Sequence, residues 1–233
     1  DLATNNLGII IDPNFYGADF VALLDTFFVF NRPLTNQFYI SASNASYGML
    51  TNGAIETGTI AGGALYTNGT YTNVSLTGGT GSGATADITV AGNAVTVVTI
   101  VEGGINYTVG DILSALAADI GGTGAGFTYT ITGMASAFDP LDIAAKAGFN
   151  DPIVGIVAIH RELWLIGALT SEVWIGTGAA DFYFQQQQGA YINHGCAAQY
   201  SIATMDVLCF FIMQDQQGSG IVVQGQGYDL TEI

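Results

Sequence analysis

The chain has 233 residues, of which 19 are Asp or Glu and only 3 are Lys or Arg, so its formal net charge is −16. A protein that grips nucleic acid needs several cations on one face. Because Arg32, Lys146 and Arg161 stand far apart in the sequence, the composition argues against gripping nucleic acid and against attraction to an anionic membrane surface.

Apolar residues make up 49% of the chain and glycine supplies 32 positions, which is typical of a folded all-β protein with many glycine-marked turns. No run reaches the roughly 18 apolar residues of a membrane span, and no basic segment precedes an apolar core as in a signal peptide, so we expect no membrane partner. Because the sequence does not start with Met, we expect it to be part of a longer protein.

The first zone, residues 1–52, is rich in aromatic side chains. Phe27–Phe30 and Gln37–Ile40 have the composition of two short strands. Residues 31–36 lie between them and contain Asn and Pro, which are typical of a turn. This zone therefore predicts a β-hairpin.

Residues 53–133 differ in character, because aromatic side chains become sparse and Gly, Thr, Ala and Val dominate. The stretch "GGTGSGATADITV" at 78–90 is echoed by "GGTGAGFTYTIT" at 121–132, and each is a glycine-rich turn that leads into an alternating strand. Neither a Walker lysine nor a βαβ pattern follows, which argues against a nucleotide-binding loop. We predict a small inserted β-domain over 53–133, resembling a sandwich or barrel.

Residues 134–233 regain aromatic side chains. Asp139 and Pro140 are suited to begin a short helical turn within residues 139–148. Short strands with Gly-containing turns follow, among them "IVGIVAIH", "ELWLIGA" and "SEVWIGT". Strands at this spacing predict a propeller, sandwich or barrel. We expect residues 1–52 plus 134–233 to form one discontinuous domain around the insertion.

The stretch "HRELWLIGALTSEVWIG" carries residue types of a catalytic or binding site. Glu162 and Glu172 are on consecutive predicted strands, and glycosidases use two carboxylates about 5–10 Å apart. An ion pair with Arg161, or an exposed sheet edge, is the simpler interpretation of these carboxylates. Trp164 and Trp174 alternate with apolar residues, which predicts strands that are buried on both faces; the alternative is a sugar-stacking platform.

A metal or thiol site is the other chemical candidate. His194 and Cys196 are close in a predicted loop, but a four-ligand zinc site would need all histidines and cysteines of the chain at irregular spacing. Cys196 and Cys209 form no CxxC pair, so we expect free, partly buried thiols, with a single disulfide as the alternative. The segment "DPNFYGAD" at 12–19 resembles a calcium loop only loosely.

We therefore expect no catalytic residue, no metal and no cofactor. The singled-out residues are expected to serve structure or interfaces: Arg161, Glu162, Trp164, Glu172, Trp174, His194 and Cys196.

Three segments resemble the tail hub, or nozzle, proteins of short-tailed bacteriophages, often described as packaged-DNA stabilisation proteins. They are "LLDTFFVFNRPLTNQFYIS", the long block from "DPLDIAAKAGFNDPIVG" to "AAQYSIATMD", and "DQQGSGIVVQGQGYDLTEI". Residues 53–133 are outside the common pattern and resemble a small β module of phage tail and fibre proteins. The closing "GYDLTEI" lacks the basic residue that the family carries there.

This resemblance implies a partial β-propeller-like platform and a homo-oligomeric ring of six copies below the portal and its adaptor protein. Such a ring would extend the DNA channel, retain the packaged genome and conduct it at ejection, in contact with a tail needle or plug or with tailspike proteins. Double-stranded DNA would pass without sequence-specific binding. The protein would be located in the virion tail after assembly in the bacterial cytoplasm.

The alternative is a carbohydrate-binding or adhesin module of a phage or a cell-surface structure. The Gly-, Thr- and Asn-rich insertion and the acidic charge also fit this second function. A glycoside hydrolase built on a propeller is a third, weaker candidate, and it would depend on the two glutamates.

Overall fold

The computed structural model describes residues 9–214 and 220–233. Over these residues the chain consists of antiparallel strands with one short α-helix, α1 (Tyr47–Leu50), and two 3-10 helices, which confirms the predicted all-β class. No helix in this part of the chain is long and apolar enough to cross a membrane. The chain divides into two compact units: the inserted unit (9–15 and Ser46–Ala137) and the three-sheet unit (Tyr16–Ala45 and Phe138–Ile233).

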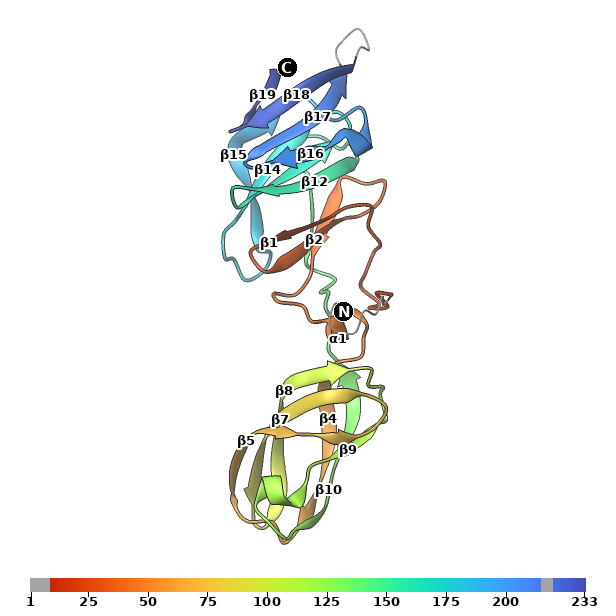
Figure 1. Ribbon diagram of the computed structural model, residues 1–233, viewed down its shortest axis with the longest axis vertical. Helices are drawn as coiled ribbons and strands as arrows, with labels where there is room; N and C mark the ends of the chain where they lie inside the picture. Colours follow the sequence, from red (N-terminus) through yellow and green to blue (C-terminus); the bar gives the residue numbers. More distant parts are fainter. Residues whose placement is uncertain (1–8, 215–219) are drawn as a thin grey trace. The chain divides into compact units, whose positions relative to one another are not determined.

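The three-sheet unit contains three four-stranded antiparallel sheets, each with its strands in chain order (Figure 1). Sheet 1 consists of β1 (Val21–Leu24), β2 (Phe27–Asn31), β3 (Gln37–Ile40) and β11 (Ile143–Ala145). Sheet 2 consists of β12 (Ile153–Ile159), β13 (Glu162–Gly167), β14 (Ser171–Gly176) and β15 (Phe184–Ile192). Sheet 3 consists of β16 (Ala203–Met205), β17 (Leu208–Gln214), β18 (Gly220–Gln226) and β19 (Asp229–Glu232), and the 3-10 helix η2 (Gln199–Ser201) precedes it.

The first and second strands of each sheet are joined by a two-residue turn. Asp25 and Thr26 in sheet 1, and His160 and Arg161 in sheet 2, have φ between 47° and 75°, and Asp206 in sheet 3 has φ 55°. Left-handed turn residues match the right-handed twist of the flanking strands. The sheets therefore repeat one strand–turn–strand segment, which reads "LLDTFFVF", "AIHRELWL" and "TMDVLCFF" in the sequence.

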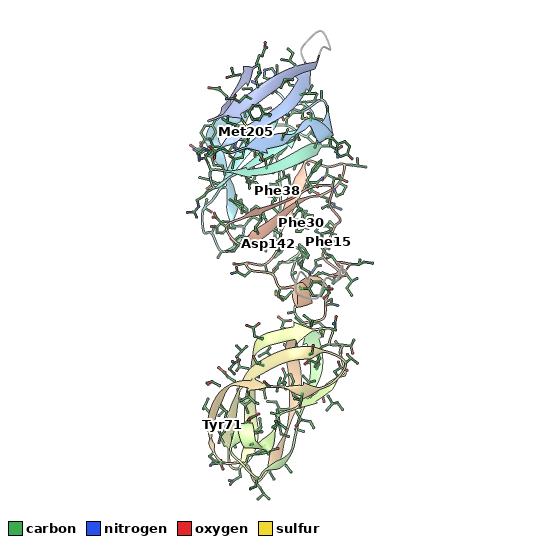
Figure 2. The ribbon with its side chains drawn as sticks, in the orientation of Figure 1. Phe15, Phe30, Phe38, Tyr71, Asp142 and Met205 are labelled. Carbon is green, nitrogen blue, oxygen red and sulfur yellow. The ribbon has the colours of Figure 1, made fainter. Side chains whose placement is uncertain are left out.

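Sheet 2 lies between sheets 1 and 3 (Figure 1). Because alternate residues of a strand point to opposite faces, its side chains divide between two cores. Leu163 and Trp174 pack towards sheet 1 with Phe38, which is labelled in Figure 2. Trp164 packs towards sheet 3 with Phe211. The central sheet is thus covered on both faces.

The predicted helical turn at 139–148 is wrong. The structure has a turn in which Asp142 N donates to the Asp139 carbonyl (3.0 Å) and Leu141 N donates to the Asp139 carboxylate (2.8 Å). Strand β11 then begins at Ile143 and pairs with β3, with Ala144 opposite Phe38. Asp139 therefore caps a turn, but completing sheet 1 prevails over the local helical preference.

The inserted unit is a sandwich of two sheets that share one core (Figure 1). One sheet has the order β4-β10-β9-β6 and the other β5-β7-β8. Their bounds are β4 (Ile55–Ala64), β5 (Gly69–Ser75), β6 (Thr77–Gly78), β7 (Ser82–Ala91), β8 (Ala94–Ile105), β9 (Ile112–Ser114) and β10 (Ala125–Met134), with the 3-10 helix η1 (Ala117–Ile120). The two strands that follow the echoed glycine-rich turns, β7 and β10, belong to different sheets.

The insertion interrupts sheet 1 between its third and fourth strands, because β3 and β11 are neighbours. The compact unit begins at Ser46 and ends at Ala137, a few residues beyond each of the expected boundaries at 53 and 133. It also includes residues 9–15. There the buried Asp12 carboxylate accepts hydrogen bonds from the Ser136 hydroxyl (2.6 Å) and from Ala137 N (2.7 Å). These contacts explain why an N-terminal segment joins the insertion.

Candidate functional site: a buried charged cluster and the sheet ends

The segment that leads from sheet 1 to sheet 2 carries a buried ion pair. Lys146 Nζ donates to Asp151 Oδ1 over 2.5 Å, to the Thr170 carbonyl over 2.8 Å and to the Thr170 hydroxyl over 3.0 Å. The side chain of Lys146 is 0% exposed and that of Asp151 is 3% exposed. Since such charges are seldom buried unless they are paired, the fold at this position depends on specific polar contacts.

Burial and hydrogen bonding act in opposite directions on the two pKa values. Burial lowers the pKa of Lys146 below its usual range, although Asp151 favours the charged form. Burial would raise the pKa of Asp151, but hydrogen bonds from Lys146, Leu169 N and Thr170 leave it below its usual value. The ammonium group meets three acceptors, so it has no free donor for a ligand. Lys146, Asp151 and Thr170 therefore form a closed structural cluster, which we call the clamp.

Glu172 extends this clamp to the start of the same segment. It is fully buried. Its Oε1 accepts from Gly148 N (2.7 Å), and its Oε2 accepts from Ala147 N (3.0 Å) and from Trp174 Nε1 (3.1 Å). A strand of sheet 2 thereby holds the connection that follows β11.

Gly167, at the end of β13, leaves room for the clamp. A Cβ atom at this position would overlap with Lys146 Nζ, Asp151 Oδ2 and the Thr170 carbonyl oxygen. Because two of these groups are fixed by the ion pair and the third is backbone, none of them can give way easily. The glycine in "WLIGALT" is therefore a packing requirement of the cluster.

A second set of polar contacts links the ends of the three sheets. Arg161 Nη2 donates to Asp25 Oδ1 over 3.0 Å and joins the first turns of sheets 1 and 2, although the arginine side chain is 80% exposed. Glu162 accepts from the Tyr228 hydroxyl over 2.7 Å and joins sheet 2 to sheet 3. This hydrogen bond raises the pKa of Tyr228. A hollow of about 460 Å³ beside it is lined by Glu162, Tyr228, His160 and neighbouring residues.

The two glutamates do not form a catalytic pair. Glu162 is opposite Ile175 across β13 and β14, whereas Glu172 is opposite Leu165. Residues that are an odd number of positions apart on a strand point to opposite faces. Glu162 therefore faces sheet 3 and Glu172 faces sheet 1, and each has its own hydrogen-bond partners. Arg161 pairs with neither of them but with Asp25.

The tryptophans and the His–Cys loop are also placed by the structure. Trp164 is 3% exposed and Trp174 is 7% exposed, so neither ring offers a free face for stacking on a sugar. His194 is exposed, and its carbonyl accepts from the Ser171 hydroxyl (2.9 Å). The Cys196 thiol is buried and donates to the Ala198 carbonyl (3.1 Å). His194 is therefore exposed to solvent, whereas Cys196 is buried in the core.

Both cysteines are free and buried. Burial, and then the proximity of Cys196, raises the pKa of the Cys209 thiol to about 12. Cys209 is consequently a thiol at neutral pH, and a thiol is a poor nucleophile and metal ligand. Within the described ranges, no group of three or more His, Cys, Asp or Glu residues is arranged to hold a metal ion.

The three basic residues are not gathered on one surface. Lys146 is buried in the clamp. Arg161 lies in the turn between the first and second strands of sheet 2, and Arg32 follows the second strand of sheet 1. Because successive turns of a meander lie at opposite ends of a sheet, the two arginines belong to different ends. Arg32 donates to Gln37 Oε1 (3.0 Å) and lies 5.0 Å from the centre of the Tyr16 ring.

Sequence reasoning missed the partners that define these contacts, namely Asp151, Thr170, Asp25 and Tyr228. Thr170, Asp25 and Tyr228 lie in separate hairpin turns and Asp151 lies in the segment before β12, so they follow no local motif. One signal was available: Lys146 is the only lysine of the chain and stands in the apolar stretch "IAAKAGF". A lysine in such surroundings indicates a buried partner.

Comparison with known proteins connects this geometry to a family. Residues 122–233 match the family described as "Bacteriophage P22 Gp10, beta-propeller", and this segment contains β10, β11 and all of sheets 2 and 3. Neither a curated protein nor a solved structure shows a significant match to the chain. Stacked four-stranded meanders are the blades of a propeller, so the three-sheet unit has the architecture that the family description names.

Residues 16–45 lie outside the matched segment, yet β1, β2 and β3 complete the sheet to which β11 belongs. The fold therefore extends the same architecture to the N-terminal side of the insertion. The sheet arrangement agrees with this sequence match over residues 122–233, which supports the resemblance to phage packaged-DNA stabilisation proteins.

Proposed function

We propose that the protein is a tail hub, or nozzle, of a short-tailed phage that extends the DNA channel below the portal, retains the packaged genome and conducts it at ejection. The observation that carries this proposal is the family match over residues 122–233, which spans sheets 2 and 3. A structural role in a phage virion is the coarser statement that the family itself supports.

The electrostatics of the chain support a channel component. The net charge is −16, Lys146 is buried, and Arg32 and Arg161 each contact groups of their own chain. Passing DNA would therefore meet no cluster of free cations that could neutralise its phosphates. A neutral to negative channel wall would let DNA slide with little adhesion.

The architecture supports a rigid platform. Sheet 2 is covered on both faces, and the clamp around Lys146 and the contacts of Arg161 and Glu162 fix its neighbours. We propose a ring of six copies that contacts the portal adaptor above and a needle, plug or tailspike protein elsewhere. A repeated heterologous contact builds such a ring.

The inserted unit fits a peripheral role. Residues 46–137 contain no Lys or Arg, and an insertion between two adjacent strands is tolerated where it projects from the surface. We propose that it contacts tail appendages or carbohydrate rather than the genome. If the insertion is instead the carbohydrate reader of a free adhesin, glycan binding will persist without any ring.

The test is made on the phage that encodes the chain. Particles assembled without the protein are expected to fill with DNA and then to lose it, and supplying the wild-type chain in trans should restore retention. Electron microscopy of restored particles should show the protein as a ring around the tail channel. Particles that lack the chain and still hold their genome would contradict the proposed function, as would density for the chain away from the tail axis.

A further inference from the structure

A hollow between one end of sheet 2 and one end of sheet 3 combines apolar and polar side chains. Three turns meet around it, those between β12 and β13, between β16 and β17 and between β18 and β19. Its volume of about 460 Å³ is within the range of small-ligand sites. The apolar contribution comes from Ile159, Trp164 and Val207, and the polar one from His160, Glu162 and Tyr228.

The packing around Trp164 gives the hollow a fixed shape. Trp164 is 3% exposed and belongs to the core between sheets 2 and 3. A Cβ atom at Gly225 of β18 would lie 2.9 Å from Cζ3 and 3.1 Å from Cη2 of this ring, so the glycine lets the indole pack closely against sheet 3. Together with the hydrogen bond from the Tyr228 hydroxyl to Glu162 (2.7 Å), this contact joins the two sheets beside the hollow. The site is therefore preformed.

The carboxylate of Glu162 has a hydroxyl partner but no cation. Its Oε1 accepts from Tyr228, and a carboxylate offers about four lone-pair sites. Neither of the two ion pairs found in the described part of the chain involves Glu162. Arg161 is adjacent in the sequence, but its guanidinium group pairs with Asp25 of sheet 1 over 3.0 Å. The hollow therefore carries a negative charge with acceptor capacity to spare.

This combination of groups selects a cation with an apolar stem. An anionic ligand would be repelled by Glu162, and the buried Trp164 offers no free face to a sugar. An arginine side chain meets the requirements, because its planar guanidinium group pairs with a carboxylate through two N–H groups and stacks on rings such as that of Tyr228. Its methylene stem can lie along apolar side chains. The ammonium group of lysine is compact and strongly hydrated, so it fits less well.

We propose that this hollow binds an arginine side chain of a partner protein, with Glu162 as the anion that recognises it. The partner is a different protein rather than a second copy, because this chain has only three Lys and Arg residues. Of these, Lys146 is buried, and Arg32 and Arg161 each contact groups of their own chain. The net charge of −16 favours a basic partner. The proposal is based on the hollow alone and is independent of the proposed function.

NMR spectroscopy of the isotope-labelled full chain tests this site directly. N-acetyl-arginine amide is the probe, and N-acetyl-citrulline amide, which has nearly the same shape without the charge, is the matched control ligand. At about pH 8, where histidine side chains are generally uncharged, the arginine probe should shift the indole N–H signal of Trp164 and the amide signal of Gly227. The indole N–H of Trp174, which donates to Glu172 on the other face of sheet 2, should not move.

Two substitutions separate the charge of the hollow from its shape. Glu162→Gln keeps an oxygen acceptor for Tyr228 and removes the charge, so it should weaken arginine binding about tenfold or more, which corresponds to about 1.4 kcal/mol. Glu232→Gln removes the same charge from an exposed residue of β19 outside the lining and should leave the affinity unchanged. Val207→Phe adds volume in the hollow without changing the charge and should also weaken binding.

Shifts at Trp164 and Gly227 with the arginine probe alone would support the proposal. Equal shifts with the citrulline compound, or an unchanged affinity in Glu162→Gln, would overturn it, because the carboxylate would then play no part in recognition. The same holds if no signal near the hollow moves at any probe concentration. Putrescine, a diamine without a guanidinium group, is the second comparison. If it binds more tightly than the arginine probe, the ligand is a free polyamine and the assignment to an arginine side chain is wrong.

Discussion

The two units of the chain bury their apolar faces in different ways. In the inserted unit two sheets cover each other and enclose one core, which includes Ile88 and Phe127. In the three-sheet unit the middle sheet contributes to two cores, one on each of its faces. A two-layer sandwich needs one shared core, whereas a stack of three sheets needs a core on each face of its middle sheet. The inserted unit is therefore held together by one core and the three-sheet unit by two.

The two units also use different hydrogen-bond donors for two of their carboxylates. Residues 46–137 contain no Lys or Arg, and Asp111 there accepts hydrogen bonds from Thr80 N, the Thr80 hydroxyl and Thr108 N, which lower its pKa. The three-sheet unit instead buries a lysine against Asp151. The fully buried Glu172 is held by neutral donors alone, so a cation is matched to Asp151 specifically and not to every buried carboxylate of this unit.

The largest effect is expected from breaking this buried pair. Lys146→Met would leave the Asp151 carboxylate buried without its cation, and we expect a loss of about 3–5 kcal/mol in the free energy of unfolding. Both tryptophans of the chain lie in the three-sheet unit, so urea unfolding followed by Trp fluorescence reports on this unit alone.

Arg161→Met is the matched control, because it also removes one cation from a carboxylate. The Arg161 side chain is 80% exposed, and exposed ion pairs contribute about 1 kcal/mol or less. Equal losses for the two variants would show that the burial of Lys146 has no energetic consequence and would contradict the clamp.

The reverse experiment destabilises only the inserted unit. Ile88 is fully buried in its core, and Ile88→Ala should cost about 2–5 kcal/mol through the lost contacts and the cavity. The change should appear in the unfolding transition followed by far-ultraviolet circular dichroism and be absent from Trp fluorescence. Val97→Ala, at a 48% exposed residue of the same unit, should change little. A parallel shift of both signals would mean that the two units unfold as one.

A smaller loss of stability is expected to differ between tryptophan substitutions on the two faces of sheet 2. Trp174→Phe keeps most of the ring volume but removes the Nε1 donor to Glu172 (3.1 Å), and we expect a loss of about 1–3 kcal/mol in addition to the change in packing. Trp164→Phe makes the same chemical change on the other face without touching Glu172. The difference between the two variants, measured by urea unfolding with circular dichroism, isolates the hydrogen bond. No difference would indicate that Glu172 is held by Ala147 and Gly148 alone.

Local signals in the sequence predicted much of the fold. The strands expected at Phe27–Phe30 and Gln37–Ile40 correspond to β2 and β3, because a turn with Asn and Pro between apolar runs is a local feature. Strand β11 was read as a helical turn because its partner β3 lies on the other side of the insertion. Strand pairing between residues so far apart in the chain produces no recognisable pattern in a short stretch of sequence.

The candidate site was less accessible to sequence reasoning. Lys146 and Thr170 are 24 residues apart and meet only when the segment after β11 packs on sheet 2. The contact of Arg161 with Asp25 likewise depends on how two sheets stack. Residue types indicated which side chains could pair, but only the stacking of sheets determines which partners they find.

The smallest expected effect concerns two carboxyl groups of the three-sheet unit whose pKa values are shifted in opposite directions. Burial, and then the charge of Asp139, raises the pKa of Asp142. A carboxyl group whose folded-state pKa lies above its unfolded value contributes stability at low pH and loses it as the pH rises through the folded pKa. Asp151, whose folded pKa is lowered, contributes stability above its unfolded pKa and loses it as the pH falls.

Asp142→Asn should therefore stabilise the protein at neutral pH, by less than about 1 kcal/mol because the group is only half-buried and the like-charge contact is partly screened. The gain should shrink in acid, where wild-type Asp142 is protonated. Asp139→Asn, which keeps an oxygen acceptor for Leu141 N, removes only the neighbouring charge, and because burial is the larger cause its gain should be smaller. A gain from Asp142→Asn that persists unchanged into acid would mean that packing rather than charge accounts for it.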